Sequence, residues 1–155
     1  MSMLEAGTSL PAFSLLNDQE QTIKKKDLLG KYTVLYFYPK DQTPGCTKEA
    51  CGFKKHHRKL ANRGVQVIGV SKDSIRSHQK FIDKYKLPFS LLSDPDYALA
   101  KSLGAFGEKK LYGKSYEGVI RSTFIIDPKG KIEKVFDKVK AASHPDEIME
   151  YFQTR

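Results

Sequence analysis

The stretch "YTVLYFYPKDQTPGC", residues 32–46, sets the architecture that the rest of the chain follows. Its first half is apolar on both faces, which is typical of a central strand covered by helices on two sides. Pro39 and Pro44 then break the run into a turn that ends at Cys46, where a helix is expected to begin. A buried strand that leads through a turn into a helix predicts an α/β fold, with a site at the carboxyl end of the strand.

The same strand-and-helix pattern continues after Cys46. A helix is predicted from Thr47 to about Arg63, with Gly64 as its stop, because Ala50, Phe53, His57, Leu60 and Ala61 fall on one stripe. The other expected elements are an N-terminal hairpin turning at Asn17 and Asp18, strands at 65–71 and 89–94, a helix capped by Asp73 or Ser74 that runs to Tyr85, a short helix near 97–103, a hairpin turning at 127–130, and a last helix after His144 and Pro145.

Parallel crossover units, followed by an antiparallel hairpin and a last helix, predict a thioredoxin-like α/β fold with a central mixed sheet flanked by helices. A flavodoxin-like sheet is the structural alternative, but it would not end in a hairpin. The chain has no repeat, low-complexity tract or linker-like stretch, so we expect one domain over residues 1–155. A domain of this length buries about 70% of the surface of its unfolded chain, so it needs no disulfide or metal to stay folded.

Composition excludes several classes of function. The chain has 27 Lys and Arg against 18 Asp and Glu, a formal charge of +9, but its lysines are spread along the sequence, which is more typical of a solvated surface than of a nucleic-acid-binding face. The N-terminus lacks a basic start followed by an apolar core, and no apolar run approaches the roughly 18 residues that a membrane span needs. We therefore expect a soluble cytoplasmic protein. Thiols are kept reduced there, so a cysteine pair indicates reactivity or metal binding more than a permanent bridge.

Cys46 and Cys51 are the two cysteines of the chain. The unpaired N–H groups at the start of the predicted helix would stabilise a thiolate on Cys46, and Thr43 lies three residues earlier, so its hydroxyl can turn back toward the sulfur. On an intact helix, Cα atoms five residues apart are roughly 8.6 Å apart, whereas a disulfide needs about 4.4–6.8 Å. The two thiols can therefore react with each other only if the helix unwinds, and Gly52 is a weak point for unwinding.

A zinc site is the second interpretation of these cysteines, because His56 and His57 follow closely. The spacing does not match paired Cys and His ligands, and adjacent helical side chains point about 100° apart. We expect no metal, with His57 along the inner edge of the helix and His56 in solvent. A thioredoxin-type Cys-x-x-Cys dithiol is absent from the sequence.

The motif "PKDQTPGC", residues 39–46, is similar to the Pro-x-x-x-Thr-x-x-Cys active-site motif of peroxiredoxins. A second cysteine five residues later resembles the bacterioferritin comigratory protein / peroxiredoxin Q subfamily. The resemblance extends over nearly the whole chain and includes "VIGVSKDS", "FSLLSD" and "GEKKLYGKSYEGVIRSTFIIDPKGKI". It implies a thiol peroxidase with a thioredoxin fold.

The resemblance also implies roles for single residues. Cys46 would be the peroxidatic cysteine, Thr43 and Pro39 would shape and shield the pocket, and Arg121 in "GVIRSTF" would match the family arginine near the sulfur. Independently, a guanidinium at the start of a strand beside the site would stabilise a thiolate and donate hydrogen bonds to a peroxide. One departure is Phe106, which stands where the subfamily often carries Trp.

The implied reaction reduces hydrogen peroxide and organic hydroperoxides to water and alcohols. Cys46 would become a sulfenic acid, Cys51 would condense with it to an intramolecular disulfide, and a thioredoxin-type dithiol would restore both thiols. No cofactor is required. Because the bridge lies within one chain, a dimer is chemically unnecessary, and we expect a monomer.

Two other functions are compatible with parts of the sequence. The first is a peroxide-responsive redox sensor or protein disulfide oxidoreductase, which would react slowly with peroxide and efficiently with a protein partner. The second is a basic nucleic-acid-binding module with incidental thiols, whose binding would depend steeply on salt and survive Cys46→Ser. The combination of Pro39, Thr43, Cys46, Cys51 and Arg121 favours the peroxidase.

Overall fold

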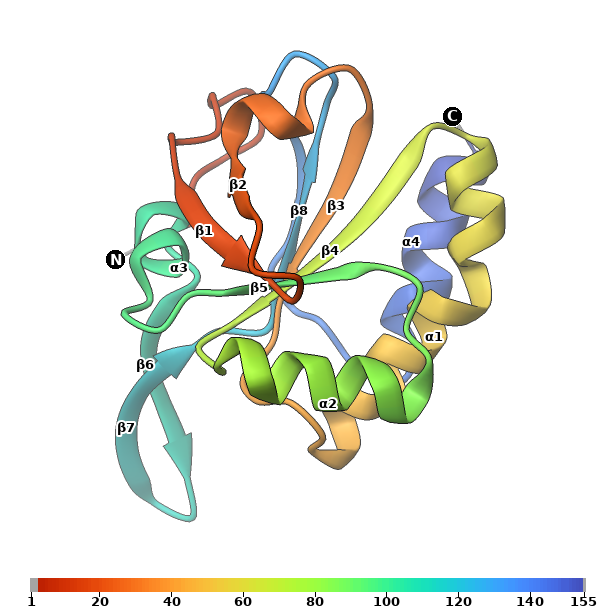
Figure 1. Ribbon diagram of the computed structural model, residues 1–155. Helices are drawn as coiled ribbons and strands as arrows, with labels where there is room; N and C mark the ends of the chain where they lie inside the picture. The colour runs from red at the N-terminus through yellow and green to blue at the C-terminus, as the bar shows by residue number, and fades with distance from the viewer. Residues whose placement is uncertain (1–2, 155) are drawn as a thin grey trace.

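A computed structural model describes residues 3–154, and its centre is a seven-stranded mixed sheet with the strand order β2-β1-β5-β4-β3-β8-β9 (Figure 1). A separate two-stranded sheet pairs β6 with β7. The elements in chain order are β1 (Ser14–Asn17), β2 (Thr22–Lys24), the 3-10 helix η1 (Lys25–Leu28), β3 (Tyr32–Phe37), α1 (Pro44–Asn62), β4 (Val65–Ser71), α2 (Ile75–Tyr85), β5 (Ser90–Ser93), α3 (Ala98–Leu103), β6 (Phe106–Leu111), β7 (Lys114–Val119), β8 (Ser122–Ile126), β9 (Ile132–Phe136) and α4 (His144–Gln153).

The register of the central strands determines which loops meet. Strands β3, β4 and β5 are parallel, and β8 runs antiparallel to β3, with Phe37 opposite Ser122. The carboxyl end of β3 therefore lies beside the start of β8. This places Arg121, the residue before β8, next to the loop that leads from β3 into α1.

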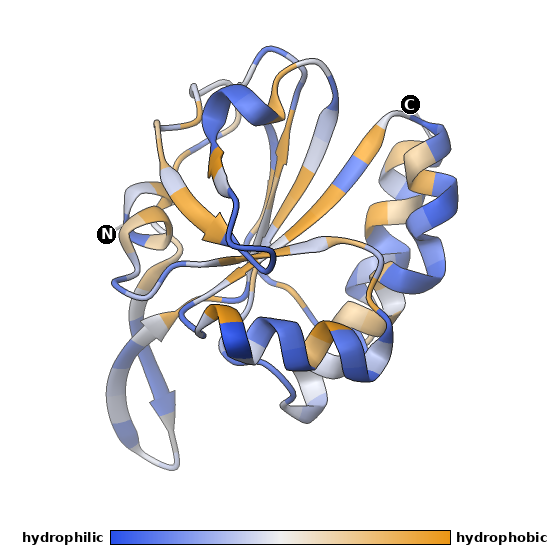
Figure 2. Cartoon of the chain, viewed as in Figure 1, coloured by the Kyte–Doolittle hydropathy of each residue, from blue (hydrophilic) through white to orange (hydrophobic). Residues whose placement is uncertain are grey.

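Alternating side chains of β3 enter two different cores, as the period of a strand requires. Val34, Tyr36 and Tyr38 belong to a core that includes Phe53 of α1 and Ile148 of α4. Leu35 and Phe37 belong to a second core, which includes Leu99 and Leu103 of α3. Figure 2 shows the apolar colour concentrated along the central strands. Helices cover both faces of the mixed sheet, so the predicted thioredoxin-like class is confirmed, and the antiparallel β8–β9 hairpin excludes the flavodoxin-like alternative.

Several local predictions are confirmed in detail. The strand at 65–71 is β4, and the helix that runs to Tyr85 is α2. Its cap is Ser74, whose Oγ accepts a hydrogen bond from the backbone N–H of Ser77 at 3.1 Å. The turn between β8 and β9 closes with the N–H of Gly130 donating to the carbonyl of Asp127 at 3.0 Å. These features depend on residues close in the sequence, which is why the sequence predicts them.

Other local predictions were wrong. Helix α1 begins at Pro44, not at Thr47, because a proline in the first turn needs no N–H partner and already has a helical φ. Likewise α4 begins at His144 and includes Pro145 instead of following it. Ala61, placed on the buried stripe of α1, is exposed.

The β6–β7 hairpin was not anticipated. Its two strands pair from Phe106 opposite Val119 to Leu111 opposite Lys114, and Figure 1 shows it extending away from the central sheet. Lysine, glutamate and glycine dominate these strands, and such residues are poor indicators of strand structure. The turn at Tyr112 and Gly113 supplies the two positive φ angles, +53° and +78°, that a two-residue hairpin loop uses.

Helices α1 and α4 lie against each other at Gly52. A Cβ atom on this residue would lie 2.6 Å from Cγ and 2.9 Å from Cβ of Pro145. Gly52 therefore allows α1 and α4 to approach each other closely. This packing role is separate from the ease of unwinding that the sequence suggested for a glycine in this helix.

This contact leads to a stability prediction. Alanine is about 1 kcal/mol better than glycine inside a helix, yet overpacking costs about 1–3 kcal/mol, so we expect Gly52→Ala to lower the free energy of unfolding. Urea denaturation of Gly52→Ala and of the double variant with Pro145→Ala would separate the two effects. The double variant should recover part of the stability lost in Gly52→Ala, since it removes the 2.6 Å contact with Cγ but keeps the 2.9 Å contact with Cβ; a single variant as stable as the wild type would contradict the packing argument.

Candidate functional site

Cys46 lies in the first turn of α1 with 2% of its surface exposed, and it is a free thiol. The N–H groups of this turn have no carbonyl one turn earlier to bind, so they remain available to a charged sulfur or to a ligand. Nη2 of Arg121 donates a hydrogen bond to the Cys46 sulfur at 3.2 Å. The two predicted site residues that are 75 positions apart are therefore in direct contact, through the register of β3 with β8.

Glu49 completes this contact and was not found from the sequence. Its Oε1 accepts a hydrogen bond from Nη1 of Arg121 at 2.5 Å, and its surface is fully buried. Its Oε2 has no hydrogen-bond partner among the described residues. The position of Glu49 three residues after Cys46 on the same helix was the available signal, because such residues share a face. One guanidinium thus bridges the sulfur and a buried carboxylate.

The charges of this pair respond differently to burial. Burial raises the pKa of the Glu49 carboxyl to about 7, although the nearby Arg121 pulls it the other way. For Arg121, burial alone would lower the pKa, but Glu49 and Cys46 outweigh it and the pKa is raised. The Arg121 guanidinium therefore stays charged, whereas the Glu49 carboxyl can hold a proton near neutral pH.

The raised pKa of Glu49 predicts how the free energy of unfolding varies with pH. Between its ordinary value of 4.5 and about 7, Glu49 holds a proton in the folded protein that the unfolded chain has released. The free energy of unfolding therefore falls as the pH rises through this window, by up to about 3 kcal/mol from this group. Urea denaturation at several pH values should show the advantage of the wild type over Glu49→Gln shrinking from pH 4.5 to 7. A difference that stays constant with pH would contradict the assignment.

Thr43 and Pro39 lie in the loop before α1. Thr43 is the N-cap residue, but its hydroxyl donates to the backbone carbonyl of Lys40 at 3.0 Å and not to the Cys46 sulfur. The Thr43 hydroxyl is used as a donor within its own turn. The three-residue spacing between Thr43 and Cys46 gives no information about this competing acceptor. Its oxygen still has lone pairs that can accept a hydrogen bond from a ligand. Pro39 is half-buried, directly after Tyr38 at the end of β3.

Cys51 lies on the same continuous helix, half-buried and free. The prediction that His56 faces solvent was wrong: its side chain is 14% exposed, and its Nε2 lies 2.6 Å from Oδ1 of Asp146 in α4. His57 is half-buried, as an inner-edge position requires. Within residues 3–154, no group of three or more His, Cys, Asp or Glu side chains could hold a metal ion.

The base of the β6–β7 hairpin approaches the site through Lys109. Its Nζ donates to the carbonyl of Val119 at 3.0 Å, and burial, followed by the charge of Arg121, lowers its pKa. The guanidinium and this ammonium thus add two positive charges near the Cys46 sulfur. The hairpin, absent from the predicted elements, contributes to the electrostatics of the site.

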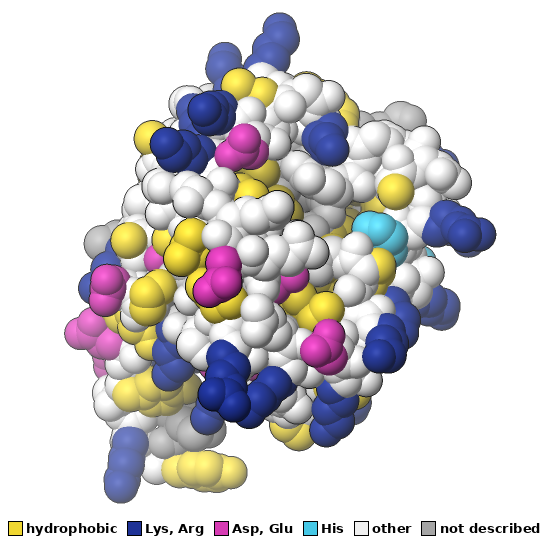
Figure 3. Space-filling model, viewed as in Figure 1, with side chains coloured by type: hydrophobic (Ala, Val, Ile, Leu, Met, Phe, Trp, Pro, Cys, Tyr) yellow, Lys and Arg dark blue, Asp and Glu magenta, His cyan; other side chains and the backbone are white. Residues whose placement is uncertain are grey.

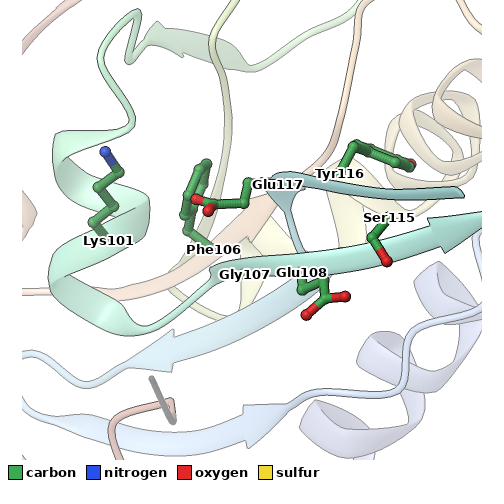
Figure 4. Close-up of a pocket in the computed structure, with 7 residues that line it drawn as sticks. All are labelled: Lys101, Phe106, Gly107, Glu108, Ser115, Tyr116 and Glu117. Carbon is green, nitrogen blue, oxygen red and sulfur yellow. The ribbon is translucent and has the colours of Figure 1, made fainter.

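A separate pocket lies between α3 and the hairpin, as Figure 4 shows. Its lining consists of Lys101, Phe106, Gly107, Glu108, Ser115, Tyr116 and Glu117. Phe106 packs on the ring of Tyr97 at a centroid distance of 4.7 Å, with the Lys101 ammonium 5.0 Å from its ring. None of the predicted site residues lines this pocket, and the ring of Phe106 packs between Tyr97 and Lys101.

In Figure 3, Lys and Arg side chains stand at the top, the right and the bottom of the visible face. Among the described residues, no helix is long and apolar enough to cross a membrane.

Comparisons with known proteins give one consistent result. A model of the AhpC/TSA family matches residues 6–135. The peroxiredoxin Bcp of Bacillus subtilis is 46% identical over 147 residues, which cover 95% of this chain and 94% of that protein. The peroxiredoxin Q of Xanthomonas campestris has a similar structure, with a TM-score of 0.90 and 35% identity over 98% of this chain and 99% of that one. A bacterioferritin comigratory protein structure from the same organism, described for alkyl peroxide reduction activity, has a TM-score of 0.89 and 35% identity over 97% and 98% of the two chains.

Proposed function

Because this chain belongs to the AhpC/TSA family of peroxiredoxins, and resembles its Bcp and peroxiredoxin Q members over nearly its whole length, we propose that Cys46 is its peroxidatic cysteine. The protein is a thiol-dependent peroxidase. The observation that supports Cys46 in this role is its contact with Arg121: the sulfur is buried, lies at a helix start, and receives a hydrogen bond from a guanidinium at 3.2 Å. The helix start and the guanidinium each stabilise negative charge on the sulfur, whereas burial by itself opposes that charge.

In the first step the Cys46 thiolate gives an electron pair to the terminal oxygen of the hydroperoxide. The O–O bond breaks, the sulfur is oxidised to a sulfenic acid, and the other oxygen leaves as water or an alcohol after taking one proton. Arg121 and the backbone N–H of Cys46 would donate to the oxygens as negative charge develops on them. Such donors are often worth about 3 kcal/mol each, because they need no reorganisation during the reaction. Thr43 and Pro39 would shape and shield the peroxide pocket.

In the second step the Cys51 thiol attacks the sulfenic sulfur, a disulfide forms, and water leaves. The helical separation of roughly 8.6 Å between their Cα atoms must shrink to about 4.4–6.8 Å, so the first turns of α1 must unwind. After Cys51, α1 is held to α4 by the contact of Gly52 with Pro145 and by the pairing of His56 with Asp146. The unwinding is therefore confined to the turns before Gly52.

The catalytic cycle also needs a reductant and a peroxide substrate. A thioredoxin-type dithiol would attack the Cys46–Cys51 disulfide and restore both thiols through a mixed disulfide. Both hydrogen peroxide and organic hydroperoxides would be substrates; alkyl peroxide reduction is described for the Xanthomonas campestris relative. The enzyme would work in the cytoplasm as a monomer, because the bridge needs no second chain, and without a cofactor.

Stopped-flow mixing of the reduced protein with hydrogen peroxide and with cumene hydroperoxide tests the proposal. We expect consumption orders of magnitude faster than that by a free thiol at the same pH, and a product whose mass is two hydrogens lower, with a Cys46–Cys51 peptide. Reaction no faster than a free thiol, with efficient oxidation of a protein partner, would favour the redox-sensor alternative. A sedimentation mass of twice 17.6 kDa would contradict the monomer.

A further inference from the structure

A buried hydrogen-bonded pair, Asp41 and His78, lies behind the loop that carries Thr43. Asp41 belongs to this loop and His78 to α2, and their side chains are 1% and 0% exposed. Nδ1 of His78 lies 2.7 Å from Oδ2 of Asp41, and Nε2 lies 3.0 Å from the backbone carbonyl of Leu92 in β5. The mechanism above uses neither side chain.

The neighbours of the pair determine where its protons are. The carbonyl of Leu92 can only accept, so Nε2 of His78 carries a proton. The carboxylate of Asp41 accepts from the hydroxyl of Tyr38 at 2.5 Å and from that of Ser77 at 2.8 Å, so its oxygens face donors. One proton lies between Nδ1 of His78 and Oδ2 of Asp41, so a hydrogen bond joins the two side chains in the interior.

The loop needs such an anchor because of its backbone. Gln42, between Asp41 and Thr43, has φ of +61°, a left-handed conformation that is costly for a residue with a side chain. The backbone N–H of Asp41 donates to Oδ2 of Asp73 at 2.8 Å, and Asp73 is in turn held by the hydroxyl of Ser71 at 2.6 Å. The loop is therefore fastened at Asp41 through both its side chain and its backbone, directly before the strained residue.

Accepting the proposed function, we propose that the Asp41–His78 pair positions the peroxide-reducing site. It holds the loop from Pro39 to Thr43 against α2 and β5, and this fixes the residue from which α1, and with it the turn of Cys46, begins. Both anchor points lie outside α1. The loop can therefore stay in place while the first turns of α1 unwind for the disulfide, and it provides a fixed starting point when the helix forms again.

The first test is a measurement on the His78 side chain in the wild-type protein. With ¹⁵N-labelled histidine, the Nε2–H of His78 should exchange its proton with water far more slowly than a free histidine does at the same pH, because the ring is buried and Nε2 donates to the carbonyl of Leu92. A ring N–H that exchanges as fast as that of a free histidine would overturn the buried pair and with it the anchor.

The second test separates positioning from stability. Asp41→Asn should slow sulfenic acid formation by about 100-fold, since a displacement of about 1 Å at a catalytic centre has that effect. Alkylation of Cys46 by iodoacetamide needs a thiolate but no aligned donors. The factor by which Asp41→Asn slows alkylation should therefore be at least tenfold smaller than the factor by which it slows the reaction with peroxide. The matched control is Asp94→Asn, which alters another buried carboxylate, one that accepts from the N–H groups of Leu99 and Ala100 in α3.

The outcomes distinguish this inference from the function it rests on. If Asp94→Asn, although destabilised, keeps the wild-type peroxide rate while Asp41→Asn loses it, the pair positions the site. If Asp41→Asn reacts at the wild-type rate, or if its peroxide and alkylation rates fall equally, the positioning role is wrong. A wild type that does not react with peroxide would instead overturn the proposed function. Should Asp41→Asn not fold, the exchange rate of the His78 ring N–H in the wild type still decides whether the buried pair exists.

Discussion

Replacing Cys46 with serine should abolish peroxide consumption. A serine hydroxyl stays protonated at neutral pH and cannot use the guanidinium of Arg121 as a thiolate does, so we expect a loss of at least about 10⁴-fold in the second-order rate constant. Stopped-flow mixing of reduced protein with hydrogen peroxide measures it. A Cys46→Ser protein that still consumes peroxide at a substantial rate would transfer the role to Cys51.

Cys51→Ser is the matched control, because it makes the same substitution five residues further along α1. It should consume one equivalent of peroxide at nearly the wild-type rate and then stop as a sulfenic acid that dimedone can trap. The resolving role of Cys51 would be wrong if this variant turned over with a thioredoxin-type reductant as fast as the wild type does. Amide exchange around residues 46–52 should rise on oxidation of the wild type and not in this variant.

Changing Arg121 should produce the second large effect. Arg121→Lys keeps a positive charge but cannot present two donors to Cys46 and Glu49 at the fixed angle of a guanidinium, so we expect the peroxide rate constant to fall by about 10²–10³-fold. Arg58→Lys, at an exposed position of α1, is the control and should leave the rate unchanged. Equal rates in the wild type and Arg121→Lys would remove Arg121 from the peroxide step.

Removing the charge altogether should also affect folding. Arg121→Met leaves Glu49 buried without its partner, which typically costs about 3–5 kcal/mol in the free energy of unfolding. This cost should be smaller below pH 7, where Glu49 can take up a proton instead. The double variant Arg121→Met with Glu49→Leu should recover stability but not peroxide reduction. Urea denaturation with stopped-flow assays on both variants tests whether the two effects separate.

Much of the fold could be predicted because its signals are local. The apolar run of β3, the cap at Ser74 and the turn at Asp127 each depend on residues within a few positions of one another. For the same reason the sequence identified Cys46 as a cysteine at a helix start. The β6–β7 hairpin escaped prediction because its strands are rich in lysine and glycine and owe their shape to pairing with each other.

The candidate site was predictable only in part. Cys46, Cys51 and Arg121 were named from their chemistry and from the motif, and the structure brings Cys46 and Arg121 into contact. The direction of the Thr43 hydroxyl was not predictable, because the carbonyl of Lys40 competes for its proton. Glu49 was missed because a glutamate in an amphipathic helix is ordinarily exposed, and its burial depends on what packs over it.

The sequence by itself indicated the candidate nucleophile, the turn that leads to it and the alternation of strands and helices, because all of these follow from neighbouring residues. The tertiary structure decided which groups meet at the sulfur and behind it. Arg121 reaches Glu49 across 72 positions and His78 reaches Asp41 across 37, and both contacts depend on how the central strands and the helices that cover them pack together. The charge state of a carboxyl or an imidazole depends on its burial and on the groups that face it, and only the packed molecule fixes these.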